Sequence, residues 1–245
     1  MGEIVPQGAK NEALQIISAV LHTDVPITVS NIPDIRDVNP LIEILGALGV
    51  KIDRPSLDTC TFQADAIDLD YMATTDFLEM AAKLRDSIML VGPLLARFGQ
   101  AVISRPGGGD KIGRRRLDTH CWGFQQLGAE FKYEENQGLF RVSSKSRLKG
   151  KYMLLDEASG TANILMATVL AEGTTTIYNA ACEPYVQQLP RMLVHMGAKI
   201  EGVGSNLLTI HGVKSLGGTK HRVLAEMIEV GSFIALAAMT QRNHH

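Results

Sequence analysis

The feature that most constrains the fold of this chain is an internal repeat with a period of about 75 residues. Three stretches share a dozen small and apolar residues, a Leu-containing end and then a short alternating segment: residues 12–33, 86–107 and 161–182. Matched apolar pairs in these stretches are 74 and 75 residues apart. This period exceeds that of solenoid repeats, so we expect a closed threefold assembly.

Each stretch leads to a second helix-like pattern with a shared ending: LGVKI (48–52), LGAEF (127–131) and MGAKI (196–200). A glycine just past an apolar helix, followed by alternation, is typical of a helix end that leads into a strand. A further strand is expected after each ending, at 59–67, 139–145 and 207–213. The sequence therefore predicts an α/β (α+β) domain of three pseudo-repeats, with helices inside and sheets outside.

A fourth copy of the pattern begins at residues 226–243 and has nothing after it. An apolar helix needs partners to bury its stripe. We therefore expect residues 1–215 to form the threefold domain. Residues 216–245 are expected to be a linker and the first helix of an otherwise absent second domain.

Composition narrows the classes of function. The formal net charge is −2, so binding of nucleic acid could only be local, and we expect none. The three cysteines form no CxxC pair, which indicates neither a zinc site nor a disulfide framework. No apolar run approaches the ~20 residues that span a bilayer. We expect a cytoplasmic protein without membrane contact, metal or other cofactor.

The segment RPGGGDKIGRRRLDTH (105–120) combines four glycines, two carboxylates (Asp110 within the glycine-rich part and Asp118 near its end) and a basic run. It matches neither the phosphate-binding P-loop nor the dinucleotide fingerprint. A glycine-rich loop can move, and arginine forms bidentate hydrogen bonds with phosphate or carboxylate. The segment is either a solvated surface turn or a mobile loop that binds an anion.

Three helix starts are expected at equivalent places in the repeats. Lys10 precedes a helix that begins near Asn11 or Glu12, Arg85 starts the second, and residues 156–164 start the third. Helix N-termini favour anions. An ordinary helix start capped by Asn11 is the alternative for the first. Together the three starts favour a pocket for a small polyanionic ligand.

The motifs GAKNEAL, NIPDIRDV, GPLLARFG, LAEGTTTIYNAACEP and MGAKI resemble the UDP-N-acetylglucosamine enolpyruvyl transferase family over residues 2–240. The segment DKIGRRRLDTH (110–120) is similar to the corresponding segment of the Bacteroidetes members of this family. The resemblance implies two domains, each an inside-out α/β barrel (a prism of three repeats), of which this chain holds about one. It also implies transfer of the enolpyruvyl group of phosphoenolpyruvate to the 3-hydroxyl of UDP-N-acetylglucosamine with release of phosphate, the first committed step of peptidoglycan synthesis.

The resemblance also implies roles for residues. Lys10 and Arg115 would hold phosphoenolpyruvate with Arg85 nearby, and Asn11 would touch the sugar region. The other matched positions are Arg115, Leu117 and Asp118 in the uridine-binding stretch, Ser159 and Gly160 at the diphosphate, His120 near the site and Glu183 in the cleft.

Asp110 stands where the family usually has a cysteine that serves as general acid and as the nucleophile toward fosfomycin. A carboxylic acid with a raised pKa can still deliver a proton, whereas it is a poor nucleophile for an epoxide that needs a thiolate. We therefore expect Asp110 to be catalytic and the parent enzyme to resist fosfomycin. Two departures from the family are one extra glycine before Asp110 and a segment two residues shorter after Ser159.

Two alternatives remain. One is a relative of 5-enolpyruvylshikimate-3-phosphate synthase, against which the GAKNEAL motif argues. The other is a non-catalytic ligand-binding half or folding fragment, because water must be excluded from a cleft that a second domain would complete. The exposed face of such a half could also pair with another copy of the chain.

Overall fold

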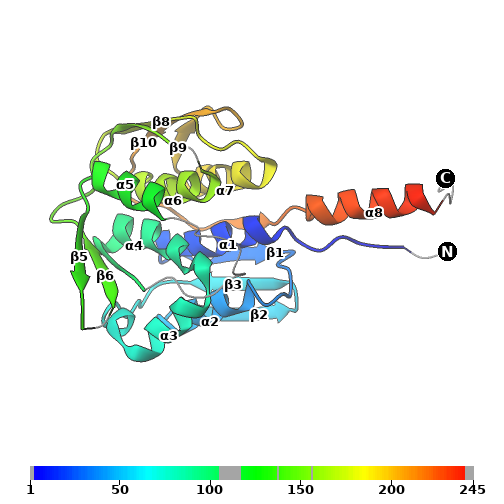
Figure 1. Cartoon of the computed structure of the whole chain (residues 1–245), viewed down its shortest axis with the longest axis horizontal. Helices are drawn as coiled ribbons and strands as arrows, with labels where there is room; N and C mark the ends of the chain where they lie inside the picture. Colours follow the sequence, from blue (N-terminus) through cyan, green and yellow to red (C-terminus); the bar gives the residue numbers. More distant parts are fainter. Residues whose placement is uncertain (1–2, 105–116, 137, 156, 241–245) are drawn as a thin grey trace.

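The computed structural model describes residues 3–104, 117–136, 138–155 and 157–240. Within these residues the strands form three separate sheets, with the orders β11-β1-β3-β2, β4-β6-β5 and β7-β8-β10-β9. Figure 1 shows the three sheets on different sides of the molecule, with helices α1, α4 and α6 between them. The chain is therefore a mixed α/β protein with a helical interior.

The first sheet is built around residues near the N-terminus. The segment that forms most of this sheet and its covering helices contains α1 (Lys10–Ala19), the 3-10 helix η1 (Val20–His22), β1 (Ile27–Ser30), α2 (Asn39–Ala47), β2 (Lys51–Ser56) and β3 (Thr59–Gln63). Every residue of α1 from Glu12 to Ala19 is buried, as expected for a helix enclosed on all sides. Burial alternates along β1 and β3, so one face of this sheet covers the helix.

The second sheet follows a short connection made of η2 (Asp70–Ala73) and α3 (Thr75–Lys83). Its elements are η3 (Arg85–Leu90), α4 (Val91–Phe98), β4 (Gln100–Ile103), α5 (Asp118–Gln126), β5 (Glu130–Glu134) and β6 (Leu139–Ser143). Strand β6 pairs antiparallel with both β4 and β5.

The chain segment that forms the third sheet has the same order of helices and strands as the second, after one added strand at its beginning. These are β7 (Tyr152–Leu154), α6 (Ala158–Thr168), β8 (Thr174–Tyr178), α7 (Pro184–His195), β9 (Lys199–Glu201) and β10 (Leu207–His211). All residues of α6 from Gly160 to Thr168 are buried. Helix α6 contacts α4, α5 and α1, so it lies at the centre of the core.

A glycine follows the second α-helix in each of the three segments that form the sheets, as the sequence predicts. Gly49, Gly128 and Gly197 have φ values of 97°, 97° and 106°, a region that favours glycine. Each is followed within a few residues by the expected strand, β2, β5 or β9. The predicted pattern of helix end, glycine and strand is confirmed in all three places.

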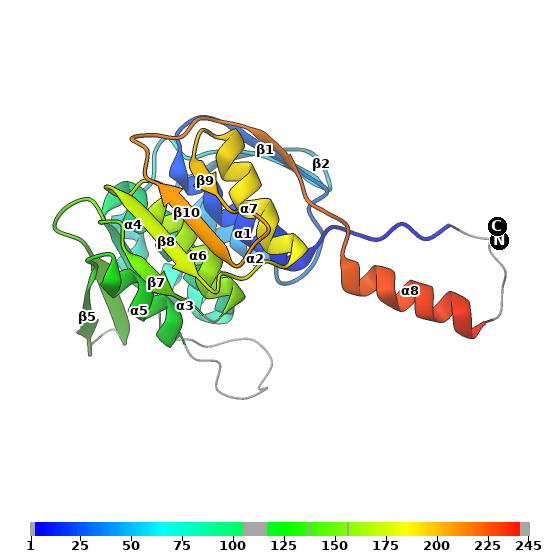
Figure 2. The same cartoon turned by 90° about the horizontal axis from the view of Figure 1, so that it is seen from above.

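The last elements are β11 (Lys220–Arg222) and α8 (Met227–Met239). Strand β11 pairs parallel with β1, with Val29 opposite His221, so residues that were expected in a linker complete the first sheet. Helix α8 buries none of its residues, and Figures 1 and 2 show it extending away from the sheets beside the N-terminal segment. No helix in the described part of the chain is long and apolar enough to cross a membrane.

Candidate functional site

Three side chains and one backbone N–H gather at the N-terminal end of α6, next to the start of α5. His120, on the first turn of α5, has no exposed surface, and its Nε2 atom lies 3.2 Å from Ser159 Oγ and 3.4 Å from Glu157 Oε2. The Ser159 hydroxyl donates to Glu157 Oε1. The backbone N–H of Gly160 donates to Glu157 Oε2 over 3.0 Å. The structure therefore brings the predicted His120, Ser159 and Gly160 together around one carboxylate.

Glu157 is the N-cap of α6. Burial raises the pKa of its carboxyl, but hydrogen bonds from His120 and Ser159, electrostatic attraction to His120 and a hydrogen bond from the Gly160 backbone together outweigh burial and lower the pKa from 4.5 to about 2. The carboxylate is thus ionised at neutral pH and sits where an anion is favoured by the helix N-terminus.

The other side of the His120 ring contacts Asn163, one turn further along α6. The Asn163 Nδ2 atom lies 3.1 Å from His120 Nδ1 and 2.8 Å from the Ile88 carbonyl oxygen. Its Oδ1 atom accepts a hydrogen bond of 2.9 Å from the Gly92 backbone N–H. Asn163 therefore joins α4, η3 and α5 through one buried amide.

Lys10 is the first residue of α1, and its Nζ atom lies 2.9 Å from Asp37 Oδ2. The backbone N–H of Lys10 donates to Glu226 Oε2 over 3.0 Å. The N-cap position is Ala9, without a side-chain cap, and Asn11 is an exposed residue of the first turn. The alternative that Asn11 caps this helix is wrong, because Glu226, far along the chain, supplies the acceptor.

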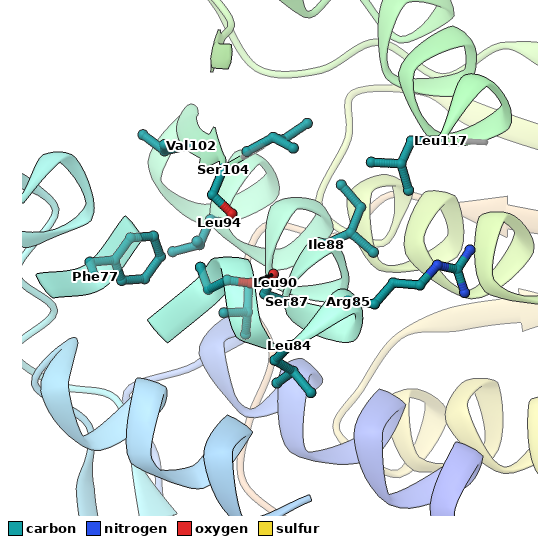
Figure 3. A pocket seen from close by; sticks show the side chains of 12 residues that line it. Phe77, Leu84, Arg85, Ser87, Ile88, Leu90, Leu94, Val102, Ser104 and Leu117 are labelled. Carbon is teal, nitrogen blue, oxygen red and sulfur yellow. Dashed lines mark hydrogen bonds between the residues drawn. The ribbon is translucent and has the colours of Figure 1, made fainter. Parts of the chain in front are cut away.

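Arg85 and Leu117 line a small hollow of about 20 Å³ between η3, α4 and α5. A hollow of this size holds about one water molecule, so it is too small for a substrate. Figure 3 shows the Arg85 guanidinium pointing away from the apolar side chains Phe77 and Leu94. The charged end of Arg85 therefore lies outside the apolar lining. Asp118, next to Leu117, is the first residue of α5.

Glu183 is the residue before α7 and is exposed. Burial raises the pKa of the neighbouring Tyr185, and the negative charges of Glu183, Glu157 and Glu226 raise it further. Tyr185 thus lies within electrostatic reach of both the α6 cluster and Glu226, which contacts Lys10. The ends of α1, α6 and α7 belong to one region of the surface.

Two predicted residues, Asp110 and Arg115, lie outside the described residues. Cys121, adjacent to His120, does not supply a substitute thiolate, because burial and the charge of Asp118 raise the pKa of its thiol. Within the described ranges, no three His, Cys, Asp or Glu side chains gather in a way that would hold a metal ion.

A larger hollow of about 480 Å³ lies where η1, α4 and the segment after α6 meet. Its lining includes Arg97, Arg147 and Lys214, and none of the predicted site residues. Arg97 donates to the carbonyl oxygens of Leu21 and Ala64. Arg97 thus has a structural role in bonding these carbonyl oxygens. Because no predicted site residue lines this hollow, it is separate from the predicted site.

Sequence reasoning missed Glu157 and Asn163. Glu157 had a signal, because an acidic residue two positions before Ser159 and three before Gly160 fits an N-cap. Asn163 had only its polarity within the apolar stretch 161–170. Its partners come from residues 43 to 75 positions away, and no local pattern identifies them.

A family model described as EPSP synthase (3-phosphoshikimate 1-carboxyvinyltransferase) matches residues 1–244. The chain belongs to this family. A UDP-N-acetylglucosamine 1-carboxyvinyltransferase of Bacteroides thetaiotaomicron is 62% identical over 242 residues, which are 98% of this chain and 55% of that protein. One of Porphyromonas gingivalis is 64% identical over 241 residues, with the same coverage. The resemblance inferred from the motifs is confirmed.

The chain spans about half the length of the curated relatives it matches. Among solved structures, the enolpyruvyl transferase NikO from Streptomyces tendae matches with a TM-score of 0.79 at 21% identity, covering 96% of this chain and 54% of that one. An EPSP synthase from Acinetobacter baumannii matches with a TM-score of 0.74 at 19% identity, covering 97% and 53%. These likenesses establish that members of the family share this mixed α/β fold.

Proposed function

We propose that this chain forms one part of an enzyme that transfers the enolpyruvyl group of phosphoenolpyruvate to the 3-hydroxyl of UDP-N-acetylglucosamine and releases phosphate. The observation that carries the proposal is the cluster of His120, Ser159 and Gly160 at the N-terminus of α6, in a chain 62% identical to a protein named for this carboxyvinyl transfer. The product would enter peptidoglycan synthesis, and the protein would act in the cytoplasm.

The proposed roles follow the helix ends. Ser159 and Gly160 supply an O–H and an N–H donor at α6, as a diphosphate requires. Lys10, with Arg85 and Arg115, would bind the phosphate and carboxylate of phosphoenolpyruvate, and Asn11 would touch the sugar. Leu117 and Asp118 would contact the uridine, and Glu183 would line the cleft. His120 would stand beside the diphosphate donors.

Asp110 is the proposed general acid that protonates the enolpyruvyl carbon. A carboxylate at this position leaves the enzyme without the thiolate that fosfomycin alkylates, so the enzyme would resist fosfomycin. Inactivation by fosfomycin at the rate of cysteine-containing enzymes would contradict this role.

The finer architecture is part of the proposal. Three units with the shared order helix, strand, helix, strand, strand are proposed to be pseudo-repeats of an inside-out α/β barrel. Residues 1–215 would be this domain, completed by β11, and 216–245 would lead into a second domain. The unburied α8 supports the idea that a second domain, or another copy of the chain, covers this face.

The test is release of phosphate from phosphoenolpyruvate, measured for this chain and for a protein of the relatives' full length. We expect release by the full-length protein that depends on UDP-N-acetylglucosamine. Release with shikimate 3-phosphate instead would favour the alternative of a 5-enolpyruvylshikimate-3-phosphate synthase. Binding of UDP-N-acetylglucosamine without turnover by either protein would favour a non-catalytic ligand-binding half.

A further inference from the structure

The amide of Asn163 has only one orientation that satisfies its neighbours. Its Oδ1 atom faces the backbone N–H of Gly92 at 2.9 Å, and its Nδ2 atom faces the carbonyl oxygen of Ile88 at 2.8 Å. A backbone N–H can only donate and a carbonyl can only accept. If the amide were reversed, Nδ2 would face the Gly92 N–H, donor against donor, and Oδ1 would face the Ile88 carbonyl oxygen, acceptor against acceptor. The two backbone partners therefore fix Nδ2 as the donor.

This orientation determines which atom of the His120 ring carries the proton. Nδ2 of Asn163 lies 3.1 Å from His120 Nδ1. Since Nδ2 is a donor, Nδ1 must accept, and it therefore has no proton. The proton of a neutral ring is then on Nε2.

The groups around Nε2 require the same assignment. Nε2 lies 3.2 Å from Ser159 Oγ and 3.4 Å from Glu157 Oε2. The Ser159 hydroxyl already donates its hydrogen to Glu157, so Ser159 offers only lone pairs to the ring. Among the contacts of the described residues, an unprotonated Nε2 would face acceptors alone, which is unfavourable in a site where His120 is fully buried.

We propose that Asn163 is a positioning residue that holds His120 as the neutral Nε2–H tautomer, which presents an N–H donor to Ser159 and Glu157 at the end of α6. His120 then completes a set of three donors with Ser159 Oγ–H and Gly160 N–H, all of which now point toward Glu157. An oxyanion of a ligand at this end would take these donors in place of the carboxylate. The assignment of that ligand as a sugar nucleotide diphosphate rests on the proposed function, whereas the position of the proton does not.

The close packing around Asn163 supports a fixed amide rather than a rotating one. A Cβ atom at Gly92 would lie 2.4 Å from the Asn163 backbone oxygen and 2.5 Å from its Oδ1 atom. Only glycine allows α4 to approach α6 this closely. The amide is thus held by the backbone on two sides and by the His120 ring on the third.

The test is a long-range proton–nitrogen NMR correlation on the ¹⁵N-labelled chain at neutral pH. The seven histidines are distinguished by the signals that disappear in His120→Gln. We expect a pyridine-type Nδ1 and a pyrrole-type Nε2 for His120. A pyrrole-type Nδ1, two pyrrole-type nitrogens or exchange-averaged shifts would overturn the proposal, and the wild-type spectrum alone decides between these outcomes.

Substitution of Asn163 separates positioning from simple packing. In Asn163→Asp an acceptor replaces the donor that faces Nδ1, so we expect the Nδ1 signal to move from pyridine-type to pyrrole-type. The matched control is Thr168→Val, because Thr168 is also buried on α6 and its hydroxyl bonds only to Leu165 among the contacts of the described chain. Equal shifts in both variants, or an unchanged Nδ1 in Asn163→Asp, would count against a positioning role.

Addition of UDP-N-acetylglucosamine tests the ligand separately. We expect the Nε2 resonance to shift on titration while Nδ1 keeps its pyridine type. A tautomer as proposed with no response to this nucleotide would contradict the proposed substrate and leave the role of Asn163 intact.

Discussion

The Nε2 atom of His221 lies 2.9 Å from Oε1 of Glu12, and the Glu12 side chain is completely buried. Oε2 of the same carboxylate accepts a hydrogen bond of 3.2 Å from the Leu224 backbone N–H. One carboxylate on helix α1 thus holds β11, the edge strand of the first sheet, and the segment after it to this helix. These contacts connect residues about 210 positions apart.

Replacement of Glu12 by alanine should destabilise the fold strongly. The change leaves the His221 ring and the Leu224 N–H without their buried acceptor, and loss of one partner of a buried pair costs about 3 kcal/mol. Urea unfolding would measure the free energy of unfolding, with the exposed Glu43→Ala on α2 as the control. A loss in Glu12→Ala no larger than in Glu43→Ala would contradict the structural role.

Gly92→Ala should also destabilise the chain. The added methyl group would meet Asn163 atoms at 2.4 Å and 2.5 Å, and overpacking of this kind costs about 1–3 kcal/mol. Gly231→Ala is the matched control, because a Cβ atom added at Gly231 on the exposed α8 would have no atom within 4 Å among the described residues. That change should be neutral or stabilise by up to about 1 kcal/mol. Equal melting temperatures for the two variants would refute the close approach of α4 and α6.

The depressed pKa of Glu157 predicts a specific dependence of stability on pH. Because the folded pKa is about 2 and the reference value is 4.5, the ionised carboxylate stabilises the fold above pH 4.5. This contribution is lost as the pH falls from 4.5 toward 2. The full shift corresponds to about 3 kcal/mol, which solvent screening reduces to about 1 kcal/mol because 39% of the side chain is exposed.

Comparison of wild type with Glu157→Gln measures this contribution. The variant should be less stable by about 1 kcal/mol at neutral pH, and the difference should vanish near the folded pKa. Urea unfolding at a series of pH values provides the measurement. A difference that stays constant with pH would show that hydrogen bonding of the side chain, rather than its charge, stabilises α6.

Glu157 should also weaken binding of a phosphorylated ligand. Its carboxylate occupies the donors of Ser159 and Gly160, so a diphosphate must displace it and overcome its charge. Glu157→Gln removes the charge, and we expect roughly tenfold tighter binding of UDP-N-acetylglucosamine, about 1 kcal/mol. Glu43→Gln should leave the dissociation constant unchanged. Weaker binding by Glu157→Gln would mean that the carboxylate helps to hold the ligand.

Much of the fold was predictable because its signals are local. The positive φ values of Gly49, Gly128 and Gly197 and the strands after them follow directly from the repeated endings. Strands β3, β6 and β10 begin at the residues expected. Strand β7 was not predicted, because three residues with exposed, buried and exposed side chains give too short an alternation. Strand β11 was missed because it depends on pairing with β1, far away in the sequence.

The candidate site likewise has a part that could be predicted from the sequence and a part that could not. His120 and Ser159 were predicted from the resemblance, and the structure places them 3.2 Å apart. The ion pair of Lys10 with Asp37 could not be predicted, because it joins α1 to the turn before α2. The cap of α1 by Glu226 likewise arises from contacts across the whole chain. Local rules identify helix ends, whereas tertiary packing decides which groups satisfy them.

The most direct test of the proposed site is calorimetric titration of the chain with UDP-N-acetylglucosamine, in wild type and in Ser159→Ala. The Ser159 hydroxyl is one of the donors at the end of α6, and loss of a hydrogen bond to a charged group should weaken binding roughly tenfold. Ser205→Ala, in an exposed turn, should bind like wild type. Binding by wild type that weakens only in Ser159→Ala is the predicted result. Equal dissociation constants for Ser159→Ala and wild type, or no binding by wild type, would contradict the assignment of this helix end to the substrate.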